Sequence, residues 1–313
     1  MERFIHFKIQ QFALFFTLII LVSCEKDNSA FDPQIRTGEL VHGIYIVESS
    51  DHTTKFRIDI GENAIFYPSR SLGGISVSKN GVIELPNPFV GILWVEVERR
   101  GTTQRTNLPI YVAQNEKLAK DVINSLLNYQ NQSLVFIARH ADASIGQDAF
   151  DPKKEDWWKS CDPALARQID DAGVLRARRI GQGIKALNIP VRQGISSEFC
   201  RAYQTLKLMD LPIKISKKAV LNHHLESVQN PLDIPEIWPE VKAMIEEQEI
   251  SNEILVVVSH CNLFDRNPFN EQIGWSSLQG DGFLMVKKSN GKLDFIGPVP
   301  NFLWTAFPNM PNL

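Results

Sequence analysis

Two histidines and an arginine stand where apolar segments of the sequence end. Residues 134–138 form an apolar run that ends abruptly in Arg139 and His140, and residues 254–259 form a second, β-branched run that ends in His260. Runs of this kind, bounded by polar residues, indicate buried parallel strands. Because ligands of open α/β sheets bind at the carboxyl ends of such strands, we expect Arg139, His140 and His260 to lie at one sheet edge.

A third segment adds a second arginine to this set. Residues 193–196 read as a short strand, and Ser197 follows as the candidate N-cap of a helix over residues 198–209. Arg201 lies in the first turn of that predicted helix. Its guanidinium and the first backbone amides of the helix would therefore face one anion.

Two arginines and two histidines at one sheet edge suit the binding and transfer of a phosphoryl group. The planar guanidinium of arginine matches phosphate oxygens in two-point contacts. A neutral histidine is a competent nucleophile at phosphorus, and surrounding donors stabilise the charge of the transition state. Because these residues do not form a carboxylate cluster of the metal-ligand type, the sequence predicts a phosphate pocket that needs neither a metal ion nor a cofactor.

The elements that must position these residues follow an α/β pattern. Apolar periodicity and capping residues predict three helices, over residues 115–129 with Asn115 as cap, 170–187 with Asp170 as cap, and 235–248. A strand pair over residues 282–287 and 292–297 is predicted to turn at Asn290-Gly291.

Residues 38–113 follow a β pattern instead. Turn signals at Gly73-Gly74, Asn80-Gly81 and Gly101 separate segments at roughly ten-residue spacing, which indicates a small sandwich. The stretch over residues 80–112 resembles the end of a bacterial immunoglobulin-like domain. We therefore predict an all-β sandwich over residues 38–113 that precedes an α/β domain over residues 114–313.

Bulk composition limits the classes of partner. The 313 residues, 43% of them hydrophobic, are enough for roughly two packed domains. The formal net charge of −3 and the lack of a basic tract in the sequence argue against nucleic acid as a partner. The oligomeric state stays open.

Residues 1–23 have the features of a lipoprotein signal peptide. Arg3 and Lys8 precede an apolar segment over residues 12–22 that is too short to span a bilayer comfortably, and Leu21-Val22-Ser23-Cys24 resembles the lipobox of bacterial lipoproteins. We expect Cys24 to be lipidated and residues 24–37 to be a tether. The protein would then be anchored in the cell envelope by lipid, as an outer-membrane lipoprotein facing the periplasm or the surface. An ordinary signal peptide with an incidental cysteine is the alternative.

Three cysteines remain once Cys24 is set aside, namely Cys161, Cys200 and Cys261. An odd number in an exported protein leaves at least one free thiol, and no pair has metal-ligand spacing. Cys200 and Cys261 each adjoin a candidate site residue. We expect them to be small buried residues, with a Cys200–Cys261 disulfide as the alternative.

From about residue 134 to residue 304 the sequence resembles the histidine phosphatase, or phosphoglycerate mutase-like, superfamily, branch 1. Four pieces occur in the family order: Arg139-His140-Ala141, residues 169–173 with the helix after them, Ser196-Ser197-x-x-Cys200-Arg201-Ala202-x-x-Thr205, and Val258-Ser259-His260. The resemblance implies a three-layer α/β/α domain. Ala141 replaces the glycine that is common in the family, which argues against a glycolytic mutase.

The resemblance also implies a role for each residue of the pocket. His140 would be the nucleophile that forms a phosphohistidine, while Arg139, Arg201 and His260 would hold the transferred phosphoryl group. The family usually adds a carboxylic acid that protonates the leaving oxygen, and Glu226 is the best match for it.

Two points around this acid stay open. The alternatives to Glu226 are Asp142, another residue, or no strict acid. His223 and His224 lie beside Glu226, and we expect solvated loop residues there, with a substrate contact as the alternative.

We therefore expect an exported, lipid-anchored phosphomonoester hydrolase that acts on a phosphorylated small molecule or another phosphoester. The alternative is a non-catalytic surface lipoprotein that binds a phosphorylated ligand. Residues 143–162 and 214–233, whose patterns are the least readable, would determine the substrate.

Overall fold

The computed structural model describes residues 35–310 except 50–54, 62–63, 69–74, 88, 100, 102–103, 150–152, 224–235 and 270–277. Residues 35–313 form one compact unit. The predictions for the signal peptide, for Cys24 and for nearly all of the tether lie outside the described residues, as do those for Glu226 and His224. Within the described part of the chain, no helix is long and apolar enough to cross a membrane.

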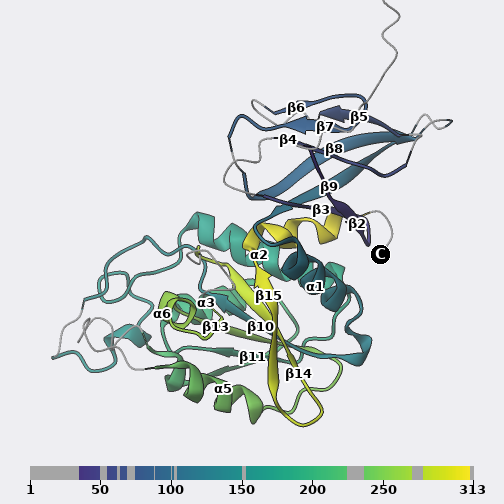
Figure 1. Ribbon diagram of the computed structural model, residues 1–313. Coiled ribbons are helices and arrows are strands. Elements are labelled where there is room, and N and C mark those ends of the chain that lie inside the picture. The colour runs from purple at the N-terminus through teal and green to yellow at the C-terminus, as the bar shows by residue number, and fades with distance from the viewer. Residues whose placement is uncertain are drawn as a thin grey trace, which may run out of the picture. The chain divides into compact units, whose positions relative to one another are not determined.

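Two sheets make up the described part of residues 36–113 (Figure 1). One has the order β2 (Glu39–Val41), β3 (Ile44–Glu48), β9 (Arg105–Ala113), β8 (Gly91–Arg99), β5 (Ala64–Pro68). The other has the order β1 (Arg36–Thr37), β4 (Lys55–Arg57), β7 (Val82–Glu84), β6 (Ser76–Val77). Buried residues of both sheets, among them Tyr45, Phe56, Ile83 and Val95, form one apolar cluster. The immunoglobulin-like character of this region stays a prediction.

A six-stranded mixed sheet is the centre of the remaining chain as described. Its order is β12 (Lys214–Lys217), β11 (Gln193–Ser196), β13 (Ile254–Ser259), β10 (Ser133–Arg139), β14 (Gly282–Lys287), β15 (Leu293–Val299). Strands β12, β11, β13 and β10 run parallel, whereas β14 and β15 are antiparallel to their neighbours. The α/β prediction and the predicted hairpin at Asn290-Gly291 are therefore confirmed.

Helices cover both faces of this sheet (Figure 1). The α-helices among the described residues are α1 (Glu116–Leu127), α2 (Asp171–Ala186), α3 (Cys200–Leu208), α5 (Trp238–Glu246) and α6 (Cys261–Asp265). Side chains alternate along β10, so Phe136 packs with residues of α1, α2 and α3 while Ile137 packs with residues of α5 and α6. The described residues also include short 3-10 helices: Tyr129–Asn131, Trp157–Lys159, Ala219–Leu221, Asn301–Thr305 and Phe307–Asn309.

Two of the predicted helix caps are confirmed and one is wrong. Asn115 Oδ1 accepts the backbone NH of Leu118, and Asp170 Oδ1 accepts that of Gly173. Helix α3, however, begins at Cys200 after Phe199, with no side-chain cap, because Ser197 forms a different hydrogen bond that is described below.

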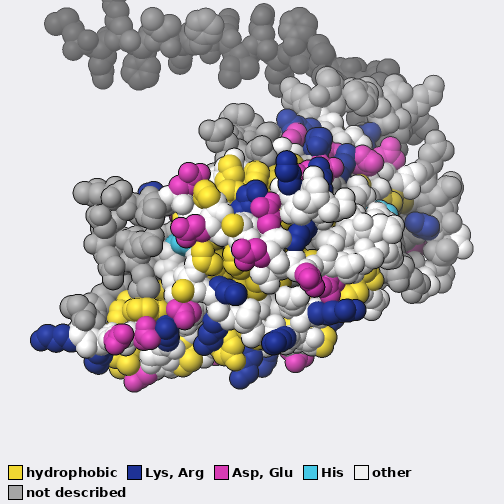
Figure 2. Space-filling model, turned by 90° about the horizontal axis from the view of Figure 1, so that it is seen from below, with side chains coloured by type: hydrophobic (Ala, Val, Ile, Leu, Met, Phe, Trp, Pro, Cys, Tyr) yellow, Lys and Arg dark blue, Asp and Glu magenta, His cyan; other side chains and the backbone are white. Residues whose placement is uncertain are grey.

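Charged side chains are mixed on the molecular face drawn in Figure 2, where basic and acidic groups of the described residues are interspersed. Binding to a nucleic acid backbone uses a continuous basic patch or stripe. The described residues on this face do not provide one, and the argument against a nucleic acid partner stays a prediction from the sequence.

Candidate active site

The ends of β10, β11 and β13 meet at one sheet edge, as the sequence pattern predicts. Arg139 pairs with Ser259 in the parallel register, and the backbone NH of His140 donates to Ser259 O at 2.9 Å. On the other side of β10, the NH of Arg139 donates to Asp281 O at 2.8 Å. The Arg139-His140 pair is thus held by backbone hydrogen bonds from both flanks.

Asp281 is in turn held by the C-terminal segment. Its carboxylate accepts the NH of Leu278 at 2.9 Å and the NH of Asn301 at 2.7 Å. Burial raises the pKa of Asp281 to about 6. The Gly280-Asp281-Gly282 segment therefore positions the end of β10.

His140 is buried, and its tautomer follows from its contacts. Its Nδ1 lies 2.8 Å from the carbonyl oxygen of Ala141, which can only accept, so the proton resides on Nδ1 and Nε2 keeps its lone pair. Burial holds the pKa of His140 well below the ordinary 6.5, and the positive charge of Arg201 lowers it further. The imidazole is therefore neutral at pH 7, which is the form that can attack phosphorus.

Arg201 is buried beside His140 and distributes its nitrogens in three directions. Nε donates to His140 Nε2 at 3.3 Å, and Nη1 donates to Asp148 Oδ1 at 3.0 Å. Nη2 is buried and has no hydrogen-bond partner among the described residues. Burial lowers the pKa of Arg201 to about 10, so the group stays charged at pH 7. One donor of a buried guanidinium is therefore available to an anion.

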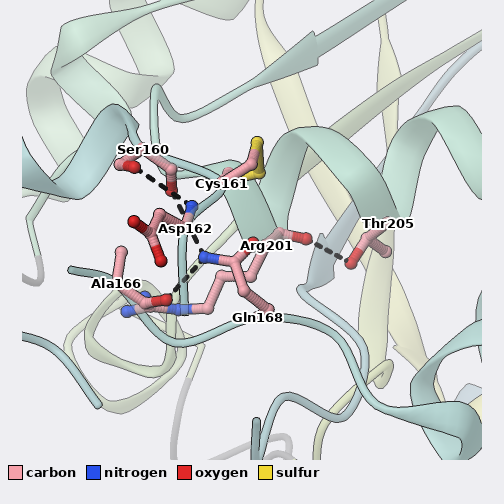
Figure 3. Close-up of a disulfide and its surroundings, with 8 residues drawn as sticks. Ser160, Cys161, Asp162, Ala166, Gln168, Arg201 and Thr205 are labelled. Carbon is pink, nitrogen blue, oxygen red and sulfur yellow. Dashed lines mark hydrogen bonds between the residues drawn. A yellow bond between two sulfur atoms is a disulfide. The ribbon is translucent and has the colours of Figure 1, made fainter. Parts of the chain in front are cut away.

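Thr205 fixes the distance between Arg201 and the end of β10. Its hydroxyl donates to Arg201 O at 2.8 Å and accepts the NH of Ala141 at 3.0 Å. Figure 3 shows the hydrogen bond between Thr205 and Arg201 within one turn of α3. The Cys-Arg-Ala-x-x-Thr piece of the sequence thus carries the positioning group together with the cation.

His260 completes the cluster. Its ring centroid lies 5.2 Å from that of His140 and 4.6 Å from that of Phe199. Ser197 Oγ and His260 Nε2 are hydrogen-bonded at 2.8 Å, which explains why Ser197 does not cap α3. Phe199 also lies under the guanidinium of Arg201, with 4.4 Å from Cζ to the ring centroid.

Two charged residues that the sequence pattern does not indicate, Asp148 and Arg167, adjoin the same cluster. Asp148 is almost completely buried and pairs with Arg201 at 3.0 Å, and its other oxygen lies 3.7 Å from Arg167 Nε. The charges of Arg167 and Arg139 both lower the pKa of His140, which places a third cation near the nucleophile. Asp148 lies in no periodic pattern that would have identified it from the sequence. Arg167 could have been identified from its position shortly before Asp170, the cap of α2.

Of the two candidate proton donors, only Asp142 lies among the described residues. Glu226 lies outside the described residues. Asp142 is paired with Arg176 of α2 at 2.8 Å, and this contact weakens its case as the proton donor. His223 is buried rather than solvated, and burial lowers its pKa to about 4, so the prediction of a solvated loop residue is wrong for it.

The predicted cysteine chemistry is also corrected. Cys161 and Cys200 form a disulfide (Figure 3). The thiol of Cys261 is outside any disulfide among the described residues and donates to Asn262 Oδ1 at 3.2 Å. Cys200 is buried at the start of α3, directly before Arg201, and Cys161 lies in the segment that leads from Asp148 to Arg167. The expectation of small buried cysteines is wrong for this pair, because Cys200 is buried but disulfide-bonded and Cys161 is exposed. The alternative, a Cys200–Cys261 disulfide, is also wrong, because the partner of Cys200 comes from a loop whose path the sequence pattern does not reveal.

The aromatic loop packs against the same region. Trp157 is buried, and its ring centroid lies 6.0 Å from that of Phe199. Trp157 therefore supports the ring of Phe199, which lies against both His260 and Arg201. Among the described residues, no group of three or more His, Cys, Asp or Glu side chains could hold a metal ion.

Comparisons with known proteins find similarity in solved structures. No protein-family model matches the sequence, and no curated protein matches it. One similar structure is the protein histidine phosphatase SixA complexed with tungstate, which is 17% identical in sequence with a TM-score of 0.35; the match covers 54% of this chain and 97% of the SixA chain. YhfR of Bacillus stearothermophilus is 13% identical with a TM-score of 0.34, and the match covers 52% of this chain and 94% of the YhfR chain. The open reading frame Rv3214 of Mycobacterium tuberculosis is 14% identical, covering 54% and 98%, with a TM-score of 0.35.

Proposed function

We propose that this chain is a metal-independent phosphomonoester hydrolase of the histidine phosphatase kind, which acts through a phosphohistidine at His140. The observation that carries the proposal is the pairing of a neutral, buried imidazole with a buried guanidinium. His140 Nε2 holds a lone pair, and Arg201 Nη2 beside it has no partner among the described residues. This arrangement presents a nucleophile and a phosphate ligand to the same point.

The reaction would proceed in two displacements. The Nε2 lone pair is released from its hydrogen bond with Arg201 Nε and attacks phosphorus, the bond from phosphorus to the leaving oxygen breaks, and that oxygen takes a proton from the general acid. Water then attacks the phosphohistidine and gives one proton back to the conjugate base of that acid, the phosphorus–nitrogen bond breaks, and inorganic phosphate leaves while His140 returns to its neutral form. Arg139, Arg201 and His260 would hold the phosphoryl group through both steps. Glu226 stays our predicted proton donor for the first step.

The finer features of the proposal come from the sequence. The lipobox-like Leu21-Val22-Ser23-Cys24 supports an exported protein that is anchored in the outer membrane by lipid. An exported enzyme is poorly placed for glycolysis, so we propose hydrolysis of phosphoesters outside the cytoplasm rather than a mutase reaction.

The test is hydrolysis of para-nitrophenyl phosphate by the purified protein with a chelator present. We compare the wild type with His140→Asn and with a matched control, His42→Asn, because His42 is exposed and its positive φ of 47° suits asparagine. His140→Asn should lose at least about a hundredfold in kcat, as expected for removal of a nucleophile, and His42→Asn should match the wild type.

Other outcomes separate the alternatives. If the wild type does not turn over but inorganic phosphate raises its melting temperature, the chain is a phosphate-binding protein without catalysis. If His140→Asn retains wild-type turnover, the phosphohistidine mechanism is wrong.

A further inference from the structure

Asp148 is a buried carboxylate within the arginine cluster, and the two displacement steps give it no role. Its side chain is 5% exposed. Oδ1 accepts both Arg201 Nη1 at 3.0 Å and the backbone NH of Arg167 at 3.0 Å, and Oδ2 lies 3.7 Å from Arg167 Nε. One carboxylate therefore connects the two arginines that adjoin the nucleophile.

The segment that carries Asp148 is fixed on both sides. Ile145 forms a β-bridge with Gln168, Gln147 N donates to Pro163 O at 3.3 Å, and Ala149 N donates to Leu165 O at 2.8 Å. Farther along the same loop, the Cys161–Cys200 disulfide connects it to the start of α3. A carboxylate held in this way is part of a preformed site and does not need to enter the pocket from solvent.

The contacts of Asp148 determine which Arg201 nitrogens are left for substrate. With Nη1 on Asp148, Nε points to His140 Nε2, and Nη2 is left without a partner in the described structure. Rotation of the guanidinium would break the Asp148 contact and turn Nε away from the nucleophile. Asp148 thus defines the one orientation in which Arg201 can contact both His140 and a phosphoryl oxygen.

Asp148 also adjusts the charge of the pocket. Arg139, Arg167 and Arg201 bring three positive charges near a neutral His140, and Asp148 removes one of them. The remaining net charge of plus two balances the charge of a phosphate monoester, which is about minus two at neutral pH. Without the carboxylate, the pocket would bind the phosphate product more tightly than turnover requires.

We propose that Asp148 is a positioning residue, which holds Arg201 and Arg167 in register with His140 and limits the affinity of the pocket for inorganic phosphate. The inference rests on the proposed hydrolase function. It assigns Asp148 no proton transfer and no contact with the reacting atoms.

Two variants separate alignment from charge. Asp148→Asn keeps an oxygen that can accept from Arg201 Nη1 and from the NH of Arg167, but it removes the charge. Asp148→Ala removes both. Asp210→Asn is the matched control, since Asp210 is exposed, pairs with Lys185 and has a positive φ of 53° that asparagine tolerates.

Steady-state kinetics and phosphate inhibition give the readout. Asp148→Asn should lower the inhibition constant of inorganic phosphate about tenfold, because a buried negative charge near the anion is gone. Its kcat should fall less than about fivefold. Asp148→Ala should lower kcat about a hundredfold, a scale seen when one preorganised donor is lost. Structural damage alone would weaken phosphate binding, so tighter binding in the asparagine variant distinguishes positioning from folding.

Several results would overturn the inference. Weaker phosphate binding in Asp148→Asn contradicts the charge argument, and equal kcat in the two variants contradicts the alignment argument. If the wild type hydrolyses phosphoesters and neither variant differs from it, only this inference fails. If the wild type shows no turnover, calorimetric titration with inorganic phosphate still tests the charge argument, and a wild type that neither turns over nor binds phosphate contradicts the proposed function as well.

Discussion

A single backbone carbonyl decides which nitrogen of His140 can act. Ala141 O takes the Nδ1 proton, so the lone pair resides on Nε2, toward Arg201. Burial and the neighbouring arginine charges then keep the imidazole neutral. These two effects are independent, because one selects the tautomer and the other the protonation state.

The depressed pKa of His140 predicts an acid-resistant enzyme. A histidine whose pKa lies well below 6.5 stays unprotonated as the pH falls through 6.5, and its nucleophilicity is lost only near its own lower pKa. We expect kcat to stay level from about pH 8 down past the ordinary imidazole pKa of about 6.5. The measurement is kcat against pH with two aryl phosphates that differ in phosphate pKa. A decline centred near 6.5 with both substrates would show that His140 titrates normally.

At the scale of single residues, the sequence predicted the position of the candidate site residues that directly follow a recognisable strand. Arg139, His140 and His260 follow apolar runs, and Arg201 follows a short strand and a cap signal. Asp148 and Arg167 were missed because they lie in the irregular loop between β10 and α2, where no periodicity assigns a direction to a side chain. The contacts of Asp148 arise from tertiary folding of that loop.

Among the elements, α1 and α2 begin where their capping residues predict, whereas α3 does not. Asn115 Oδ1 caps α1, and Asp170 Oδ1 caps α2 while the other oxygen of Asp170 accepts the Ser144 hydroxyl, so this tertiary partner does not compete with the cap. Ser197 has a single side-chain oxygen, which is hydrogen-bonded to His260, and α3 begins at Cys200 without a side-chain cap. A tertiary hydrogen bond has overridden a local signal, and such competition is invisible in sequence.

The loop between β10 and α2 is linked to α3 by the Cys161–Cys200 disulfide, which joins two cysteines that are 39 residues apart in the sequence. On the chain-entropy account, a loop of this length contributes about 4 kcal/mol of stability. We expect Cys161→Ser, at the exposed end of the bridge, to lower the free energy of unfolding by up to about that amount and to reduce phosphatase activity, because the loop carries Asp148 and Arg167.

Chemical denaturation and turnover, each with and without dithiothreitol, check this prediction. Reductant should shift the wild type toward the behaviour of Cys161→Ser and leave that variant unchanged. A wild type whose stability and activity are insensitive to complete reduction would contradict the role given to the disulfide.

At the scale of the whole molecule, one of the apolar clusters spans the predicted domain boundary. Val41, Ile44 and Ile46 from β2 and β3 belong to the same cluster as Val122 and Leu126 of α1. The rings of Tyr111 and Phe302 also meet edge to face at 5.8 Å. The change from strands to helices near residue 114 was readable from the sequence, but the contacts across it were not, since they join residues far apart in the chain.

This shared core predicts cooperative unfolding of residues 35–313. Differential scanning calorimetry should show one transition. Ile46→Ala should lower its midpoint as a whole, because removing a buried isoleucine side chain costs about 2–5 kcal/mol. The exposed Leu175→Ala serves as the control with little expected change. Two separate transitions, with only one of them sensitive to Ile46→Ala, would show that the β region and the α/β region unfold independently.

The central claim is that His140 carries the phosphoryl group, and the most direct test is to trap it there. The wild type is mixed with para-nitrophenyl phosphate, quenched rapidly in alkaline denaturant, in which phosphohistidine survives, and analysed by intact and peptide mass spectrometry. We predict one added phosphoryl group, located on His140, labile to acid and absent from His140→Asn. A phosphoryl group on another side chain, or labelling that persists in His140→Asn, would contradict the mechanism.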